Sequence, residues 1–238
     1  MAGWHVEWAL LDMNGTLLDP GGIAEPLGGG TEERRLVSEA FHEALLLTMA
    51  DTLSGGSWRP LPEYLAATLE RALRARGREL TQLEAAIQRA GRMDLFPEAR
   101  AALARLQEAG LHTGVLTNSS TDAAERALES AGLRDCLDVV IGSDGVQTYK
   151  PHPRVYEHAA TSLATDPGQM CLVAAHAWDV MGAMRARLRG GWVARSERWL
   201  VPIVSAPDVQ GEDLQEVAAK LVMHVRSGRG RPIATPRR

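Results

Sequence analysis

The chain contains little cysteine and no long hydrophobic run. Cys136 and Cys171 are its only cysteines, and because they lack metal-ligand spacing we expect two buried thiols rather than a disulfide framework. No stretch approaches the roughly 20 apolar residues that a membrane span needs, and no basic signal segment precedes the first apolar run, Trp8 to Leu11. These absences predict a cytoplasmic protein with no membrane partner.

An excess of positive charge is also missing. The formal net charge is −4 at pH 7, and the sequence pI is about 6.0, which argues against a nucleic-acid partner because such a surface needs clustered basic side chains. The hydrophobic content of 45% over 238 residues is ample for a buried core. We therefore expect a compact globular protein of one large domain, or of a core domain with a smaller insertion.

Two regions differ in periodicity. After the run that ends before Asp12, a Gly-rich segment over 21–30 predicts a flexible connection, and 31–92 shows helical spacing with a break at 54–57. From 97 onward helical and strand patterns alternate, which predicts an α/β fold with a Rossmann-like, doubly wound parallel sheet and an inserted helical cap. The expected elements there are helices at 97–109, 121–131, 153–164, 179–187 and 211–225, and strands at 111–116, 138–141, 170–175 and 191–194.

These patterns also predict the division of the chain. We expect residues 1–20 and 95–226 to form the core domain and 21–94 to form the helical cap. The arginine-rich end, 227–238, lies among Gly and Pro residues and is expected to be a disordered tail.

Polar side chains follow several predicted strands at their carboxyl ends. Parallel α/β sheets bind ligands beyond those ends, so these side chains are expected to form one site. The segments concerned are Asp12-Met13-Asn14-Gly15-Thr16, Thr117-Asn118, Lys150-Pro151 and Ala174-Ala175-His176-Ala177-Trp178-Asp179.

Taken in order, the four segments resemble the motifs of the haloacid dehalogenase superfamily, and more narrowly its type II 2-haloacid dehalogenase branch. The resemblance is most specific over 143–151 and 177–183. It implies that Asp12 is a nucleophile that forms a covalent ester. It also implies that Lys150 pairs with Asp12, that Thr16 hydrogen-bonds the site's carboxylates, and that Asp179 orients the hydrolytic water.

Other positions are expected to bind a small carboxylate substrate. Asn118 and Ser119 would stabilise an anion near a helix N-terminus, although helix capping explains this part of the chain equally well. His176 could assist the water near neutral pH or could be a supporting hydrogen-bonding residue. The full set of expected substrate-binding residues is Asn14, Phe41, Thr117, Asn118, Ser119, Tyr156, His176 and Trp178.

The same segments bear on a metal. Phosphatases of this superfamily carry a general acid where this chain has Asn14 and a second acid where it has Ala175, and their magnesium screens repulsion between carboxylate and phosphate. A halide leaves without protonation. We therefore expect no metal or other cofactor, with a Mg²⁺ site at Asp12, Asn14 and Asp179 as the alternative.

The chain departs from the dehalogenase branch in several places. Phe41 aligns with the cap arginine that receives the departing halide, while Ala174 and His176 replace a common Ser and Asn, and Asn14 replaces a Tyr. The leading hypothesis is a metal-independent hydrolase of small 2-haloacids. The alternatives are a magnesium-dependent phosphatase of small metabolites and a non-catalytic ligand-binding descendant. The resemblance also implies a possible homodimer.

Overall fold

The computed structural model describes residues 4–229, and its centre is a six-stranded parallel sheet. The strands are β1 (Trp8–Leu11), β4 (His112–Thr117), β5 (Val139–Gly142), β6 (Met170–Ala174), β7 (Arg189–Val193) and β8 (Val209–Gly211). Their order in the sheet is β5-β4-β1-β6-β7-β8, and every adjacent pair is parallel. The chain thus starts in the middle of the sheet and winds to both sides, which confirms the α/β fold class.

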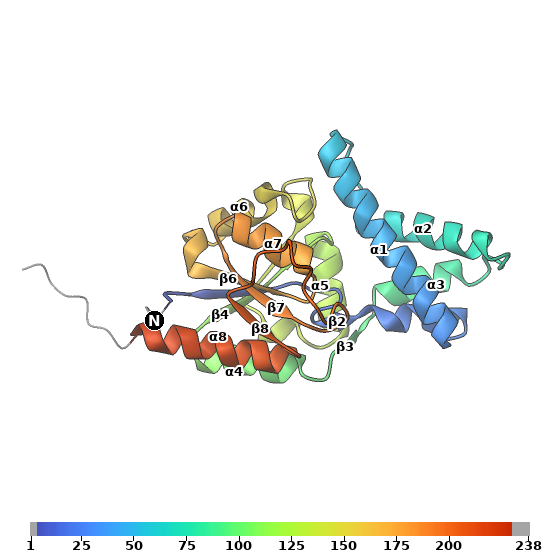
Figure 1. Cartoon of the computed structure of the whole chain (residues 1–238). Coiled ribbons are helices and arrows are strands. Elements are labelled where there is room, and N and C mark those ends of the chain that lie inside the picture. The colour runs from blue at the N-terminus through green and yellow to red at the C-terminus, as the bar shows by residue number, and fades with distance from the viewer. Residues whose placement is uncertain (1–3, 230–238) are drawn as a thin grey trace, which may run out of the picture.

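Helices cover both faces of the sheet (Figure 1). They are α4 (Ala99–Glu108), α5 (Thr121–Ser130), α6 (Pro153–Ser162), α7 (Ala177–Arg185) and α8 (Leu214–Arg229), and short 3₁₀ turns at η2 (Arg134–Cys136), η3 (Ser143–Gly145) and η4 (Pro167–Gln169) join some of them to strands. Along β1 the side chains alternate: Ala9 and Leu11 join the cluster under α4 and α8, and Leu10 joins the one under α6 and α7. The sheet is therefore buried on both faces, as its apolar strands require.

A helical segment leaves the sheet after its first strand and lies beyond the carboxyl ends of the strands (Figure 1). It consists of η1 (Pro20–Leu27), α1 (Thr31–Ser54), α2 (Leu61–Ala75) and α3 (Leu83–Ala90). Where the chain departs and returns, β2 (Leu18–Asp19) pairs antiparallel with β3 (Asp94–Leu95). That this segment acts as a separate domain over 21–94 stays a prediction.

Three sequence-based expectations need correction. The segment 21–30 is mostly not a flexible connection: η1 forms there because Ile23 and Ala24 are fully buried against the helical segment. Strand β8 was not expected. Helix α8 begins at Leu214 and continues to Arg229, so residues 227–229, assigned to a disordered tail, are helical, and the rest of that tail lies outside the described residues.

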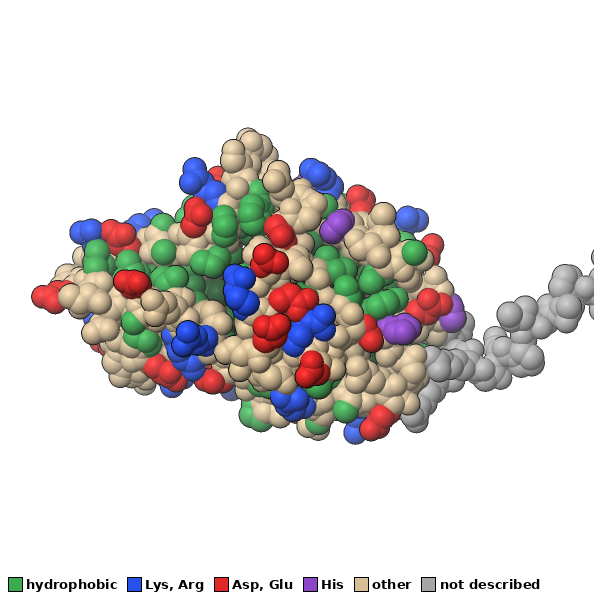
Figure 2. Space-filling model, turned by 180° about the vertical axis from the view of Figure 1, so that it is seen from behind, with side chains coloured by type: hydrophobic (Ala, Val, Ile, Leu, Met, Phe, Trp, Pro, Cys, Tyr) green, Lys and Arg blue, Asp and Glu red, His purple; other side chains and the backbone are tan. Residues whose placement is uncertain are grey.

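The thiols and the surface are otherwise unremarkable. Both cysteines are unpaired; Cys171 is buried as expected, but Cys136 in η2 is partly exposed. Within residues 4–229 no helix is long and apolar enough to cross a membrane. On the face shown in Figure 2, acidic and basic side chains are interspersed with hydrophobic ones.

Candidate active site

Asp12 directly follows β1 and lies in a tight turn that its neighbours enforce. Gly15 has φ +85°, a left-handed conformation that glycine adopts without strain, and its N–H donates to the carbonyl of Leu18 (2.7 Å). The turn brings the Thr16 hydroxyl to Asp12 Oδ2 at 2.9 Å, while the same hydroxyl accepts from the N–H of Ala175 (3.0 Å). The loop after β1 is thus attached to the loop after β6.

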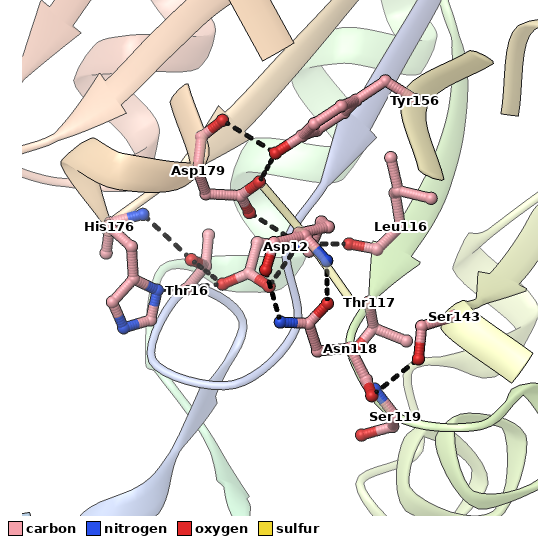
Figure 3. Close-up of polar contacts among 12 residues, drawn as sticks. Asp12, Thr16, Leu116, Thr117, Asn118, Ser119, Ser143, Tyr156, His176 and Asp179 are labelled. Atoms are coloured by element: carbon pink, nitrogen blue, oxygen red, sulfur yellow. Dashed lines mark hydrogen bonds and ion pairs between the residues drawn. The ribbon is translucent and has the colours of Figure 1, made fainter. Parts of the chain in front are cut away.

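Lys150 lies between the carboxylates of Asp12 and Asp179, both of which Figure 3 labels. Its Nζ donates to Asp12 Oδ1 at 2.9 Å, to Asp179 Oδ2 at 2.5 Å and to the carbonyl of Leu116 at 2.7 Å. Lys150 and Asp179 are completely buried. All three ammonium hydrogens therefore have acceptors, which is what a buried charge requires.

The pairing controls the charge state of the nucleophile. Burial alone would raise the pKa of Asp12, but the positive charge of Lys150 and the hydrogen bond from His176 hold that pKa well below its ordinary value. Burial likewise opposes the charge on Lys150, yet the two carboxylates raise its pKa. Asp12 is therefore a carboxylate, and Lys150 an ammonium, throughout the physiological pH range.

Asp179 is held by two donors. Lys150 contacts one of its oxygens, and the Tyr156 hydroxyl donates to the other, Oδ1, at 2.7 Å. Burial, together with the nearby charge of Asp12, raises the pKa of Asp179 although Lys150 acts in the opposite direction. Tyr156 is fully buried and holds Asp179 through this hydrogen bond, and its expected place beside the substrate stays a prediction.

His176 lies on the other side of Asp12, with its Nδ1 3.3 Å from Oδ2. The ring of Trp178 stacks on it at 5.4 Å between centroids. Burial disfavours the charged imidazole, but the hydrogen bond to Asp12 and the negative charge of that carboxylate outweigh burial and raise the pKa of His176.

Asn118 and Ser119 form hydrogen bonds within their own loop and with the backbone of Lys150. The Asn118 side-chain oxygen accepts from the backbone N–H of Lys150 (2.7 Å), so this amide fixes the lysine's backbone rather than the Asp12 carboxylate. The Ser119 N–H donates to Thr117 Oγ1 (3.2 Å), and the helix that follows is capped by Ser120. Together these contacts shape the loop that supports the site.

Two cavities open beside Asp12. A small one brings the nucleophile together with most of the expected substrate-binding residues, and its lining consists of Asp12, Asn14, Phe41, Leu45, Leu61, Thr117, Asn118, His176 and Trp178. The other has a volume of about 310 Å³ and shares Asn14, Phe41 and His176 with it. Phe41 comes from α1, so the helical segment forms one wall of the site.

Some residues that line the two cavities were not predicted from the sequence. Leu45 and Leu61 complete the apolar wall, and the sequence alone does not distinguish these leucines from ordinary core positions. Arg195 lines the 310 Å³ cavity, with its guanidinium over the ring of Phe96 (3.5 Å) and a hydrogen bond to Glu98 (2.6 Å). The sequence did offer an indication of this residue, because Arg195 directly follows a predicted strand.

Comparison with known proteins agrees with this geometry. Residues 6–187 match the family model of haloacid dehalogenase-like hydrolases. The chain belongs to this hydrolase family. Asp12, Lys150 and Asp179 all fall within the matched region, on the carboxyl side of the sheet.

Individual relatives of this hydrolase are of two kinds. (S)-2-haloacid dehalogenase 1 of Pseudomonas sp. (strain CBS-3) is 32% identical over 179 residues, which cover 73% of this chain and 75% of that protein. A phosphatase of Mycobacterium tuberculosis (strain CDC 1551 / Oshkosh) is 35% identical over 142 residues, 58% of this chain and 63% of that protein.

The fold of the hydrolase also matches solved structures. The L-2-haloacid dehalogenase of Xanthobacter autotrophicus, solved with chloropropionic acid covalently bound, superposes with a TM-score of 0.78 at 22% identity, over 90% of this chain and 97% of that one. At this identity the likeness establishes the fold.

Proposed function

We propose that the protein is a metal-independent hydrolase in which Asp12 displaces the leaving group, most directly a halide, from the α carbon of a small 2-substituted carboxylic acid. The observation that carries the proposal is the position of Lys150. Its ammonium bridges Asp12 and Asp179, so it keeps the nucleophile ionised and supplies the positive charge of the site. The names of the Pseudomonas and Xanthobacter proteins support the same chemistry.

The contacts of the two carboxylates favour a site that works without magnesium. Mg²⁺ requires oxygen ligands in near-ideal octahedral geometry, but both oxygens of Asp12 already accept hydrogen bonds from Lys150 and Thr16. Asp179 is equally occupied, and Lys150 would repel a second cation at this position. Among the described residues no group of three or more His, Cys, Asp or Glu side chains could hold a metal.

The proposed reaction has two steps. In the first, an oxygen of Asp12 attacks the α carbon, and the leaving group departs as an anion with the electron pair of its bond, which leaves an ester on Asp12. In the second, water attacks the carbonyl carbon of that ester, the bond between Asp12 and the product breaks, and a 2-hydroxy acid leaves. The water oxygen joins the regenerated carboxylate, one water proton goes to the hydroxyl of the product, and the other proton is released.

The walls of the small cavity indicate which leaving groups suit the site. Phe41, Leu45 and Leu61 are apolar, and Phe41 stands where the type II dehalogenases place an arginine. This apolar wall, unlike the polar side of the same cavity, offers no hydrogen bond to replace an ion's hydration, which penalises strongly hydrated anions most. We therefore expect bromide and chloride to be released much faster than fluoride.

The test is halide release from a panel of 2-bromo acids, 2-chloro acids and haloacetates in the presence of EDTA, with Asp12→Asn as the control. The proposal expects release by the wild-type protein and none by the variant. No release from any member of the panel, or release only after magnesium is added, contradicts it.

The phosphatase alternative has one observation in its favour, the Mycobacterium relative. Phosphate release from small phosphate esters that depends on added magnesium would establish it. The homodimer and the cytoplasmic location expected from the sequence stay predictions.

A further inference from the structure

Asp179 is badly placed to accept a proton from the hydrolytic water. Its side chain is completely buried, and its two oxygens already accept hydrogen bonds from Lys150 and Tyr156. It also lines neither of the two cavities described above, so a water molecule in either one meets other side chains first. A group that lines these cavities is therefore better placed to serve the second step of the proposed reaction.

His176 is the titratable side chain that meets both the nucleophile and the open space. Figure 3 shows His176 next to Asp12, and its Nδ1 lies 3.3 Å from Asp12 Oδ2. The ring lines both the small cavity at Asp12 and the 310 Å³ cavity. Trp178 stacks on the ring. On the Gly15 side, a β carbon at that position would lie only 3.0 Å from the ring carbon Cε1. The imidazole is thus held in place beside the carbon that water must attack.

Asn14 supplies a second and independent observation. Its side-chain oxygen is buried and has no hydrogen-bond partner, although buried polar atoms are rarely left without one. Asn14 lines the same two cavities as His176. Its oxygen is therefore free to accept a hydrogen bond from a donor that enters these cavities.

We propose that His176 is the general base of ester hydrolysis and that Asn14 orients the same water molecule. The inference rests on the proposed function. Water has two hydrogens, and the cavity beside Asp12 offers two acceptors, Nδ1 of His176 and Oδ1 of Asn14. The water oxygen then faces the carbonyl carbon of the Asp12 ester.

Hydrolysis of the ester then proceeds through the following bond changes and proton transfers. The water oxygen bonds to the carbonyl carbon, Nδ1 of His176 takes one water proton, and the bond from Asp12 to the product breaks. The product alkoxide then receives a proton, for which the imidazolium is the nearest donor. This transfer regenerates the base. The proton of the water-derived hydroxyl, left on the Asp12 carboxyl, then passes to solvent, and Asp12 returns as a carboxylate.

Formation of the ester prepares the base. In the free protein the charged groups around His176 are Asp12 after β1, Asp179 on α7 and Lys150 before α6, and Arg195 lines the same cavity. Burial and Lys150 lower the pKa of His176, whereas the hydrogen bond and charge of Asp12, together with the charge of Asp179, raise it. Because the ester carries no charge, its formation lowers the pKa of His176 and favours the neutral imidazole when a base is needed.

The experiment compares wild-type protein with His176→Ala in rapid-mixing halide release and in mass spectrometry of the intact protein. The variant should release one equivalent of halide in a burst at a rate near that of the wild type. Steady turnover should then be roughly 10² to 10⁴ times slower, with an ester adduct on the peptide that contains Asp12. The burst also shows that the variant is folded.

Two further variants sharpen the test. Asn14→Ala should show a weaker form of the same defect, with steady turnover slowed about tenfold. His112→Ala is the matched control: this histidine also faces an aspartate, Asp138 at 3.6 Å, but lies at the opposite end of the sheet. It should behave as wild type.

Several results would overturn the inference. A slow burst without adduct would place His176 in the first step, and unchanged steady turnover would remove it from catalysis. Wild-type hydrolysis by Asn14→Ala would overturn the role of that residue alone. If wild-type protein releases no halide, the proposed function itself falls and the inference falls with it, which separates the two failures.

Discussion

At the scale of single residues, Lys150 is the group on which the site depends. It is buried between Asp12 and Asp179, so its loss leaves two adjacent carboxylates without a compensating charge. The other lysine of the chain, Lys220, is an exposed partner of Glu216 on α8. The pair of lysines therefore allows a matched comparison of buried and exposed ammonium groups.

Lys150→Met should reduce turnover by about 10³-fold and the free energy of unfolding by about 3 to 5 kcal/mol. Without the ammonium the pKa of both carboxyls rises, so the folded variant binds more protons than its unfolded chain. Its stability should consequently increase as the pH falls from neutral. Urea unfolding at several pH values tests this, with Lys220→Met changing stability by less than about 1 kcal/mol. Equal stabilities of Lys150→Met and Lys220→Met would contradict a stabilising role of the buried ion pairs of Lys150.

The lowered pKa of Asp12 predicts how the first step responds to acid. Because Lys150 and His176 stabilise the ionised form, Asp12 stays a carboxylate well below the pH at which an ordinary aspartate is protonated. Halide release at low substrate concentration should therefore not fall as the pH is lowered from about 7 to about 5. Stopped-flow measurement of the burst over that range checks it. A decline with a midpoint inside the range would show that the nucleophile is not held ionised.

At the scale of elements, the turn between β1 and β2 fixes the distance between nucleophile and histidine. Gly15→Ala forces a residue with a β carbon into a left-handed conformation and against the ring of His176. Gly77 also has a positive φ, +64°, but nothing lies within 4 Å of a β carbon there. The second glycine therefore isolates backbone strain from contact with the ring.

Both substitutions should cost about 1 kcal/mol of stability through backbone strain. Only Gly15→Ala should also slow turnover by about tenfold or more, because displacement of a catalytic group by a fraction of an ångström is costly. Thermal unfolding and steady-state kinetics of the two variants measure the difference. Equal kinetics in both would mean that the position of His176 does not matter.

The elements themselves show what sequence patterns can and cannot predict. The apolar run before Asp12 and the alternation after residue 97 located the parallel sheet and placed Asp12, Thr117 and Asp179 near its carboxyl edge. Strand β8 escaped notice because it has only three residues. The Gly-rich segment was misjudged because burial of Ile23 depends on α1 and α3, which lie elsewhere in the sequence.

The site shows the same limit. The order of the motifs predicted that Asp12, Lys150 and Asp179 share one site, and the structure places Lys150 in contact with both carboxylates. The motifs could not predict that Tyr156 binds Asp179, or that the Asn118 amide binds the backbone of Lys150. Such pairings depend on side-chain directions across neighbouring strands and loops, which a single sequence does not encode locally.

At the scale of the whole molecule, the helical segment and the sheet domain meet next to the catalytic lysine. The hydroxyl of Tyr149 donates to the carbonyl of Arg59, and its ring packs against Trp58 and Tyr64. Trp58 also donates to Ser143 at 3.3 Å. Because Tyr149 immediately precedes Lys150, this contact couples the two parts of the molecule to the active site.

Tyr149→Ala should cost about 3 kcal/mol of stability, since it empties a buried aromatic site, and should raise KM more than it lowers kcat. Tyr149→Phe keeps the ring and loses only the hydroxyl, so it should cost about 1 kcal/mol and leave KM nearly unchanged. Chemical unfolding measures the stability of the two variants, and steady-state kinetics measure their KM and kcat. An unchanged KM in Tyr149→Ala would show that the contact does not support substrate binding.

The central claim is the ester on Asp12, and a single turnover in heavy-oxygen water tests it most directly. With protein in excess over a 2-haloacid, hydrolysis of the ester puts the solvent oxygen into the Asp12 carboxylate, and the 2-hydroxy acid receives an unlabelled oxygen from the protein. Mass spectrometry of the Asp12 peptide and of the product should show the label in the peptide alone. Label in the product of the first turnover would mean that water attacks the substrate directly, and the account would be wrong.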